Sequence, residues 1–321
     1  MLTELDRALV AALHLKPRAP WELLARWLDA SESTVARRAA RLFDSGQVAV
    51  VGLVDRTSNG HGLEVSVRVG CRPGTVEPVL RAVAGDSDVR FAAALTGAGG
   101  ILVEAVAADH EALLRLVDGS IGSVDGVVDH TTAVITDHHT GAYAWDPQIL
   151  DKETADAIRA RPDPAEPAER DTGDPLTEQE SRIVEALGRD GRMSVTDLAS
   201  AVGTSASTVR RRMDSLSRRG ILHFRTVVEP SILGFGAEYM LWLETEPTRT
   251  ATVAARLAAH PAVRYLVGTS GEYTLFGACA LTRGEDLADF LSEALGDGRG
   301  VRRAHPHLVL RAAKRHWRRT R

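Results

Sequence analysis

The strongest constraint on this chain is an internal repeat, in which one constant offset of 174 positions relates its two halves. The segment Leu2-Thr3-Glu4 returns as Leu176-Thr177-Glu178, and the same offset still carries Gly126 onto Gly300. A single shift that holds over such a length without a gap predicts a tandem duplication of one unit. Because the period is far longer than that of solenoid repeats, each copy is expected to hold its own hydrophobic cores.

Length and composition bound the class of protein. The chain has 321 residues, of which 44% are hydrophobic and 26% are charged, as in globular proteins. No stretch approaches the ~20 apolar residues of a membrane helix, and the first residues lack the pattern of a signal peptide. Two cysteines, Cys71 and Cys279, are too few for a disulfide framework or a zinc cluster. We therefore expect a cytoplasmic protein without a structural metal, a bound cofactor or a membrane partner.

The first part of each copy has the pattern of three short helices. Apolar residues at Leu5, Leu9 and Leu13 share one face of a helix, and a second short helix and a tight turn follow. The third helix is expected over residues 31–42 and 205–216, and Gly46 and Gly220 end it. Three helices with a short turn between the second and third predict helix-turn-helix domains over residues 1–50 and 176–225.

The outward face of each third helix carries hydroxyls and arginines. Hydroxyls near a helix start reach phosphates and base edges, and arginines one turn further on bind guanine or phosphate. Either this face binds DNA or it is the solvated, basic face of a packing module. Both copies keep Ser-Thr-Val-x-Arg-Arg although packing requires only the core, so DNA binding is favoured. The predicted DNA-binding residues are Ser31, Ser33, Thr34, Arg37, Arg38, Arg41, Ser205, Ser207, Thr208, Arg210, Arg211 and Arg212.

The second part of each copy follows a β-type run, at 48–54 and 221–228. The order strand, helix, strand, strand, helix, strand then predicts α+β, ferredoxin-like domains over residues 60–140 and 235–313. The strands are expected at 64–69, 90–95, 101–107 and 131–136, and at 238–245, 264–268, 274–281 and 307–310. Helices cover one face of such a sheet, so the other face requires a partner sheet, which the second copy supplies. An acidic, proline-rich linker is expected over 141–175 and a basic tail over 314–321.

Taken together, these motifs resemble those of the Lrp/AsnC, or feast/famine, family of transcriptional regulators over nearly the whole chain. The shared elements are the Leu-Thr-Glu start, the third-helix motif, Leu233-Gly-Phe-Gly236 and the turn Ser270-Gly271-Glu272-Tyr273. The resemblance implies a non-enzymatic regulator that binds double-stranded DNA and is modulated by an amino acid or another small metabolite. It further implies that this duplicated chain is similar to a fused dimer. Several such chains are then expected to assemble into a homo-oligomer.

The turn between the second and third strands is the ligand site that the resemblance implies. The candidate ligand-binding residues are Gly97, Gly99, Gly271, Glu272, Tyr273 and Thr274. The family's turn reads Thr-Gly-x-Tyr/Phe-Asp, and both copies lack its carboxylate, so the usual partner of an amino acid's ammonium group is missing. A tight β-turn made by the glycines alone is the competing interpretation.

Charge is distributed unevenly behind the formal net charge of −4. Residues 205–220 hold five arginines against one acid, whereas residues 31–46 hold three arginines against two acids. Residues 301–321 hold eight basic residues and no acid, and the linker region is strongly acidic. Because local patches bind phosphate, we expect the second recognition helix to dominate DNA affinity and the two half-sites to be unequal.

Two other functions are open. Sirohaem decarboxylases look similar in fold, and in that interpretation His61 and His223 would contact a tetrapyrrole. The chain would otherwise be a metabolite-binding module whose helix-turn-helix domains no longer bind DNA. The other histidines, among them His138 and His305, form no recognised metal spacing, and no catalytic residue is predicted.

Overall fold

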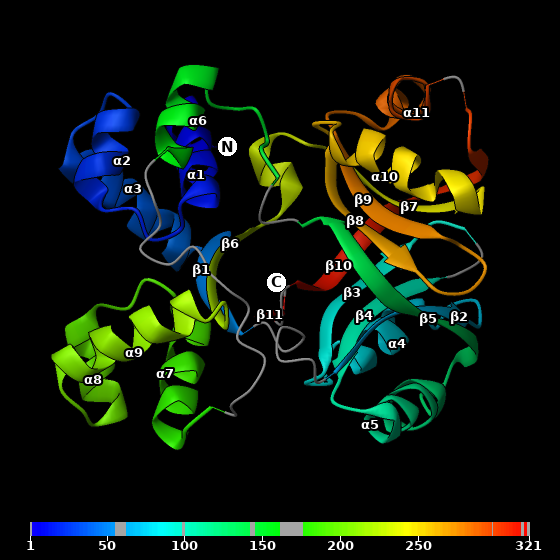
Figure 1. Ribbon diagram of the computed structural model, residues 1–321, viewed down its shortest axis with the longest axis horizontal. Coiled ribbons are helices and arrows are strands. Elements are labelled where there is room, and N and C mark those ends of the chain that lie inside the picture. Colours follow the sequence, from blue (N-terminus) through cyan, green and yellow to red (C-terminus); the bar gives the residue numbers. More distant parts are fainter. Residues whose placement is uncertain are drawn as a thin grey trace. The chain divides into compact units, whose positions relative to one another are not determined.

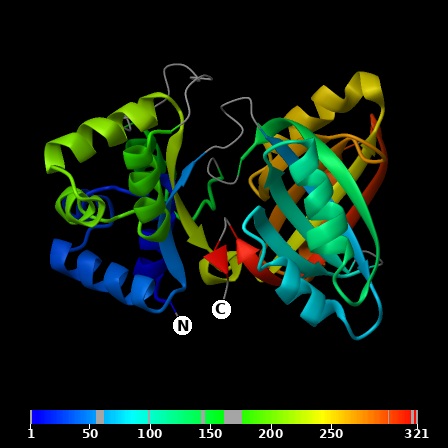
Figure 2. The ribbon, with the colours of Figure 1, turned by 90° about the horizontal axis from the view of Figure 1, so that it is seen from below.

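The computed structural model describes residues 2–54, 62–97, 100–141, 145–160, 176–296, 298–315 and 318–319. It divides into two compact units, one of residues 1–61 and 146–233 and the other of residues 62–145 and 234–321. The first, here called the head unit, collects the helical domains of both copies, and the second, the sheet unit, collects both sheets (Figures 1 and 2). The predicted α+β fold, with each domain type present twice, is confirmed.

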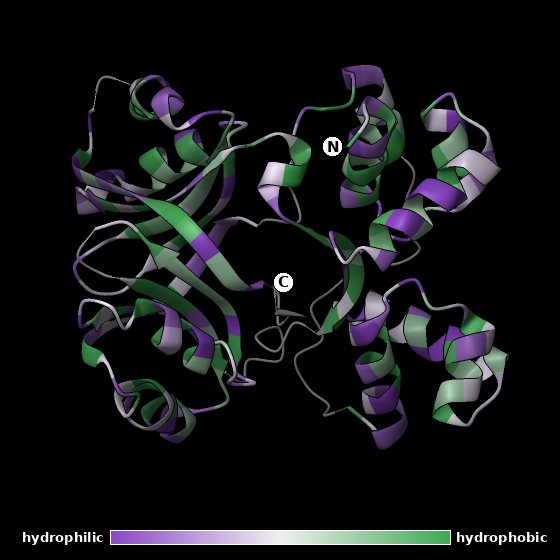
Figure 3. Ribbon diagram, turned by 180° about the vertical axis from the view of Figure 1, so that it is seen from behind, coloured by the Kyte–Doolittle hydropathy of each residue, from purple (hydrophilic) through white to green (hydrophobic). Residues whose placement is uncertain are grey.

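Each head consists of three helices and a strand. The first head contains α1 (Glu4–Leu15), α2 (Trp21–Trp27), α3 (Glu32–Asp44) and β1 (Val48–Val54), and the second contains α7 (Glu178–Arg189), α8 (Val195–Val202), α9 (Ala206–Arg218) and β6 (Leu222–Val228). Hydrophobic and hydrophilic residues alternate along these helices (Figure 3), so that each buries one face. The turn before the third helix needs a left-handed residue, which is Gly203 at φ 69° in one head and Asp29 at φ 47° in the other.

The two heads are joined by a two-stranded antiparallel sheet. Strand β1 pairs with β6 from Val48 opposite Val228 to Val54 opposite Leu222. Helix α7 of the second head packs on β1 of the first, and α1 of the first head packs on β6. A short turn of 3-10 helix, η2 (Pro230–Leu233), then leads out of β6. Each head therefore completes its core with a strand that is shared between the copies.

The segment expected to be a linker is partly structured. Helix α6 (Lys152–Arg159) is capped by Asp151, buries Ala155 and Ile158, and packs against α1. Before it, Trp145 is buried and its Nε1–H donates to the carbonyl of Pro261 at 2.8 Å. Two apolar residues three apart are too weak a pattern to predict a helix in so acidic a stretch. The proline-rich part, residues 161–175, lies outside the described residues.

The sheet unit follows the predicted strand and helix order in both copies. The first copy contains β2 (Leu63–Cys71), α4 (Val76–Val83), β3 (Val89–Leu95), β4 (Ile101–Ala107), α5 (His110–Leu114), the π-helix η1 (Arg115–Gly122) and β5 (Val127–Thr140). The second contains β7 (Ala237–Thr245), η3 (Pro247–Arg249), α10 (Thr250–Ala258), β8 (Val263–Thr269), β9 (Leu275–Leu281), η4 (Gly284–Asp286), α11 (Leu287–Leu295), β10 (Val301–Arg315) and β11 (Arg318–Arg319).

The last strand of each copy is longer than predicted because it belongs to both sheets. The first part of β5 pairs with β2 and its end pairs with β8, while β10 pairs first with β7 and then with β3. The strands therefore form a closed ring in the order β3-β4-β2-β5-β8-β9-β7-β10. The predicted basic tail begins too early, since Lys314 and Arg315 are buried residues of β10.

Three hydrophobic cores are seen among the described residues of this unit. Helices cover the outer face of each sheet, around Val67 and Leu80 in the first copy and around Leu241 and Leu257 in the second. The inner faces of the two sheets meet in a third core, which contains Phe91, Leu102, Met240, Trp242 and Phe276. The prediction that the second copy supplies the partner sheet is thus confirmed. Among the described residues, no helix has the length and apolar character required to cross a membrane.

Candidate nucleic-acid interface

The start of each recognition helix, α3 and α9, is built from hydroxyl side chains. Ser31 is the N-cap of α3 and accepts a hydrogen bond from the backbone N–H of Thr34, and Ser205 does the same for Thr208 in α9. Ser33 and Ser207 lie beside these caps, with their Oγ atoms 3.2 Å and 2.9 Å from the cap hydroxyl. The predicted hydroxyls therefore gather at a helix N-terminus, where the helix dipole favours a phosphate.

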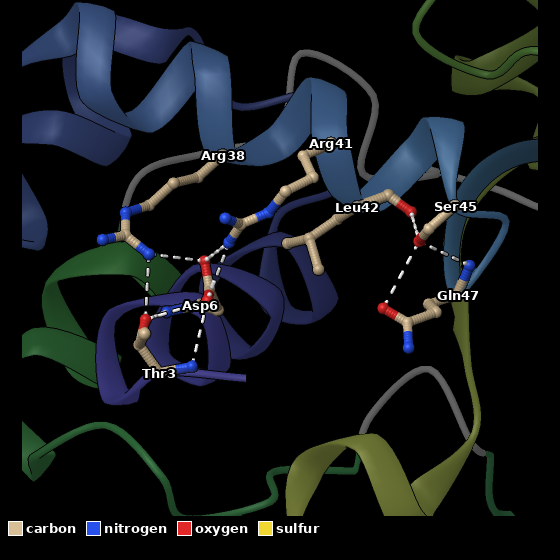
Figure 4. A network of polar contacts seen from close by, with 7 residues as sticks. All are labelled: Thr3, Asp6, Arg38, Arg41, Leu42, Ser45 and Gln47. Atoms are coloured by element: carbon tan, nitrogen blue, oxygen red, sulfur yellow. Dashed lines mark hydrogen bonds and ion pairs between the residues drawn. The ribbon is translucent and has the colours of Figure 1, made fainter. Parts of the chain in front are cut away.

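Two predicted DNA-binding arginines of the first head, Arg38 and Arg41, pair with a buried carboxylate of α1 (Figure 4). Arg38 donates to Asp6 Oδ1 and to Thr3 Oγ1, each at 2.9 Å, and Arg41 donates to the same carboxylate at 2.9 Å. Asp6 has a side chain only 1% exposed. Burial alone would raise the pKa of Asp6, but hydrogen bonds from Thr3 and Arg38 outweigh it and lower the pKa to about 2.

The second head repeats this contact with altered partners. Arg212 lies 3.7 Å from Glu180 Oε1, and the second cation is Arg219, also at 3.7 Å. Burial would raise the pKa of Glu180, but hydrogen bonds from Thr177 and the nearby arginines lower it. The carboxylates of both heads also complete the capping box of the first helix. The repeat does align Asp6 with Glu180, but sequence reasoning missed that this carboxylate holds the recognition helix.

Three predicted arginines remain available on the outer face. Arg37 in α3 and Arg210 and Arg211 in α9 are exposed, and within the described part of the chain they form no ion pair or hydrogen bond. Arg210 takes the position of Ala36 in the repeat, so the second head presents two such arginines and the first presents one. The charge asymmetry predicted from the sequence therefore persists among the available groups.

Reciprocal hydrogen bonds join the two heads that carry the recognition helices. Arg18 donates to the carbonyls of Gly191 and Met193, and Arg192 donates to those of Pro17 and Ala19 at 2.7 Å and 2.8 Å. Burial and the proximity of Arg18 lower the pKa of Arg192 to about 10. Because each bond crosses from one copy to the other, the heads form a paired, two-headed module.

Replacing Asp6 by Asn is expected to lower the stability of the first head by about 2 kcal/mol at pH 7. The folded pKa of about 2 lies below the ordinary 3.8, so this stabilisation is complete above pH about 4 and is lost as pH falls toward 2. Hydrogen exchange in α1 at pH 7 and thermal melts from pH 5 to 2.5 measure it. Glu4→Gln, an exposed change in the same first turn, is the control. If the stability difference between the wild type and Asp6→Asn does not shrink as the pH falls, this role of Asp6 is contradicted.

The turns between β3 and β4 and between β8 and β9, which are predicted to bind a ligand, also connect the two copies within the sheet unit. Thr96 exchanges hydrogen bonds with Leu308 of β10, and Ser270 exchanges them with Val134 of β5, all at 2.9 Å. Gly97, at φ 88°, lies against His307, where an added Cβ would meet the imidazole Nδ1 at 2.6 Å. The turns therefore dock the last strand of the opposite copy.

The structure does not bring all six candidate ligand residues together. Gly271, at φ 93°, makes a tight turn with open space around it, and Glu272 is exposed. Thr274 Oγ1 bonds to Thr245 and to the carbonyl of Leu243, so its hydroxyl is used within the domain. Gly99 lies outside the described residues. Tyr273 does face a functional group, because Arg68 of β2 lies 5.3 Å from its ring centroid.

Buried glutamates of the sheet unit form two ion-pair clusters. In one, Arg90 pairs with Glu64 and Glu104, and His138 Nε2 lies 2.6 Å from Glu64. In the other, Arg264 and Arg315 pair with Glu238. Burial would raise the pKa of Glu238, but Arg315 and Arg264 lower it, so the carboxylate is charged. No group of three or more potential metal ligands occurs among the described residues.

Comparison with known proteins gives the same two domain types. The model of the AsnC-type helix-turn-helix domain matches residues 2–42 and 176–217, and that of the Lrp/AsnC ligand binding domain matches residues 64–141 and 238–318. The HTH-type transcriptional regulator LrpA of Pyrococcus horikoshii is 31% identical over 140 residues, 43% of this chain and 99% of that protein. The regulator FL11 of the same organism is 26% identical over 141 residues, 44% of this chain and 93% of that protein.

A match to a solved structure can extend over both copies of the chain. The siroheme decarboxylase NirDL matches 98% of this chain and 93% of its own, with a TM-score of 0.63 and 15% sequence identity. At that identity the match shows a shared duplicated fold.

Proposed function

Since the chain belongs to the Lrp/AsnC family and contains its two domains twice, we propose that it is a metabolite-modulated transcriptional regulator with two unequal DNA-binding heads. The observation that carries the proposal is the pair of recognition helices, joined by β1 and β6, with exposed Arg37, Arg210 and Arg211. The names of the related regulators LrpA and FL11 support it.

The contacts expected with DNA divide by residue type. Ser31, Ser33 and Thr34, with Ser205, Ser207 and Thr208, lie at the helix starts and would contact phosphates or base edges. The available arginines would bind guanine edges or phosphates in the major groove. Arg38, Arg41 and Arg212 would act mainly by holding the recognition helices on α1 and α7, because their guanidinium groups already pair with carboxylates.

The effector is proposed to bind in the sheet unit, near the turns that contain Gly97 and Gly271 to Tyr273. Supporting this, each turn contacts the last strand of the other copy, so a ligand there would touch both copies at once.

We also propose that whole chains assemble into a larger oligomer. The exposed apolar side chains of Val128 and Leu310 on the last strands support this. Light scattering would measure that assembly.

Genome-wide capture of DNA fragments by the purified protein tests the proposal. We expect enrichment of a limited set of sites whose two half-sites differ in sequence, with occupancy that changes when candidate metabolites are added. A double variant with Arg210 and Arg211 replaced by alanine is the matched control and should recover few sites. Uniform recovery of fragments by both proteins would contradict a sequence-specific regulator.

A tetrapyrrole-binding enzyme is the second candidate, favoured by the match of the whole duplicated fold to NirDL. Of the two histidines assigned to it, His61 lies outside the described residues, and His223 Nε2 is 2.6 Å from the carbonyl of Gly220 within its own head. Uptake of a tetrapyrrole with a Soret shift, together with no retention of DNA, would favour the enzyme.

A further inference from the structure

Arg68 is an arginine on the inner face of β2 without a carboxylate partner. Along this strand Val65, Val67 and Val69 face the helices, so Arg68 belongs to the opposite face, which meets the second sheet. Arg90, Arg264 and Arg315 each pair with a buried glutamate, whereas Arg68 has no ion pair or hydrogen bond within the described residues. Its guanidinium is always charged and here half-buried, and no described residue supplies a compensating anion.

Aromatic side chains hold this guanidinium in place. Its Cζ atom lies 5.8 Å from the ring centroid of Trp242 and 5.3 Å from that of Tyr273. His307 packs edge-on against Trp242 at 5.3 Å, and His305 packs against Tyr273 at 5.4 Å. A planar cation that is held by rings presents its N–H fork to a carboxylate. Trp242 is buried behind the guanidinium, whereas the half-buried ring of Tyr273 offers an apolar surface to the rest of a small ligand.

The cluster of one arginine with aromatic and histidine side chains occurs once, because the equivalent positions of the repeat hold other residues. At the position equivalent to Arg68, the second copy has Trp242. At the positions equivalent to Tyr273, His305 and His307, the first copy has Gly99, Thr131 and Ala133. The duplicated chain therefore has one arginine of this kind, although its fold has two equivalent positions.

We propose that the sheet unit binds one small aromatic carboxylate per chain, with its carboxylate on Arg68 and its ring beside Tyr273. The proposal rests on the proposed function in one respect, namely that this ligand is the effector of a DNA-binding regulator. It assigns the anion contact to a strand residue of the first copy and the aromatic contacts to the second copy. Occupancy would thus connect the copies across the inner core.

Titration of the full chain with phenylacetate, and with its neutral amide as a matched probe, tests the proposal. Calorimetry should show saturable binding of phenylacetate, at least about tenfold tighter than that of phenylacetamide, because a charged hydrogen bond is lost with the amide. Equilibrium dialysis should give one phenylacetate per chain. Equal affinity for the two probes, no saturable binding of phenylacetate, or two molecules per chain would overturn the proposal.

Variants identify the residue responsible. Arg68→Gln should weaken phenylacetate binding by about ten- to a hundredfold, whereas Arg81→Gln, an exposed arginine of α4, should leave it unchanged. Should Arg68→Gln lower the melting temperature, Arg68→Lys keeps the charge without the fork and should still weaken binding severalfold. Wild-type affinity in both Arg68 variants would overturn the assignment.

DNA binding without added carboxylate separates the two proposals. Wild-type DNA affinity in Arg68→Gln, together with lost phenylacetate binding, supports the carboxylate site. DNA binding without any phenylacetate binding would overturn this site and leave the regulator intact. Phenylacetate binding in a chain that retains no DNA would overturn the regulator and leave the site intact.

Discussion

Replacing Arg210 and Arg211 by alanine is expected to lower the affinity of the chain for its operator by about a hundredfold, while Arg37→Ala lowers it by about tenfold. The three guanidinium groups are exposed on the outer faces of the recognition helices and form no ion pair with any residue that the structure describes. If both arginines bind phosphates, their removal should also reduce the slope of log affinity against log salt by about 2. Fluorescence anisotropy over a range of salt concentrations measures both quantities.

The controls for this prediction lie in the same heads. Arg182→Ala removes an arginine that pairs with Glu178 on the surface of α7, and should change neither affinity nor salt slope appreciably. Folding should be preserved in the double variant, because Val209 and Leu216 form the buried face of α9 and alanine favours helix. If Arg37→Ala and the double variant lose equal amounts of operator affinity, the predicted inequality of the two heads is contradicted.

The fold could be predicted well from the sequence because apolar residues recur at regular spacing and because the same pattern occurs in both copies. Apolar spacing located the helices of each head, and the constant offset showed that two copies share one architecture. The ends of β5 and β10 were missed for a physical reason. They pair with the opposite copy, and such pairing depends on closure of the strand ring rather than on the local pattern around Thr140 or Arg315.

The candidate sites were less predictable, because a side chain's role depends on what lies opposite it in space. Arg38 and Arg212 have the pattern of DNA-contacting arginines, yet Asp6 and Glu180, far away in sequence, engage them. Arg68 had a signal that was overlooked, namely an arginine on the strand face expected to be buried against a second sheet. Neither its aromatic partners nor its missing carboxylate can be derived from spacing alone.

Replacing Gly191 by valine is expected to separate the two heads and to lower affinity for a complete operator by about a hundredfold. Gly191 donates its N–H to the carbonyl of Val50 at 2.8 Å, and an added Cβ would lie 2.8 Å from backbone atoms of Val51. Because these neighbours are backbone atoms of β1, they cannot move aside as a flexible side chain would. The loop should therefore leave β1 and weaken the contacts of Arg18 and Arg192.

The loss should be specific to operators with two half-sites, because a fixed pair of heads binds the second half-site at high effective concentration. A DNA fragment with only the stronger half-site should bind Gly191→Val within about threefold of the wild type, since the core of the second head, around Ile183, Leu198 and Val209, is built from residues of the second copy. Gly188→Ala, whose added Cβ would lie an ordinary 3.6 Å from Gly52 O, is the matched control and should bind both fragments normally. An equal loss on both fragments would indicate damage to a head, and unchanged binding to both would show that the pairing of the heads does not govern operator affinity.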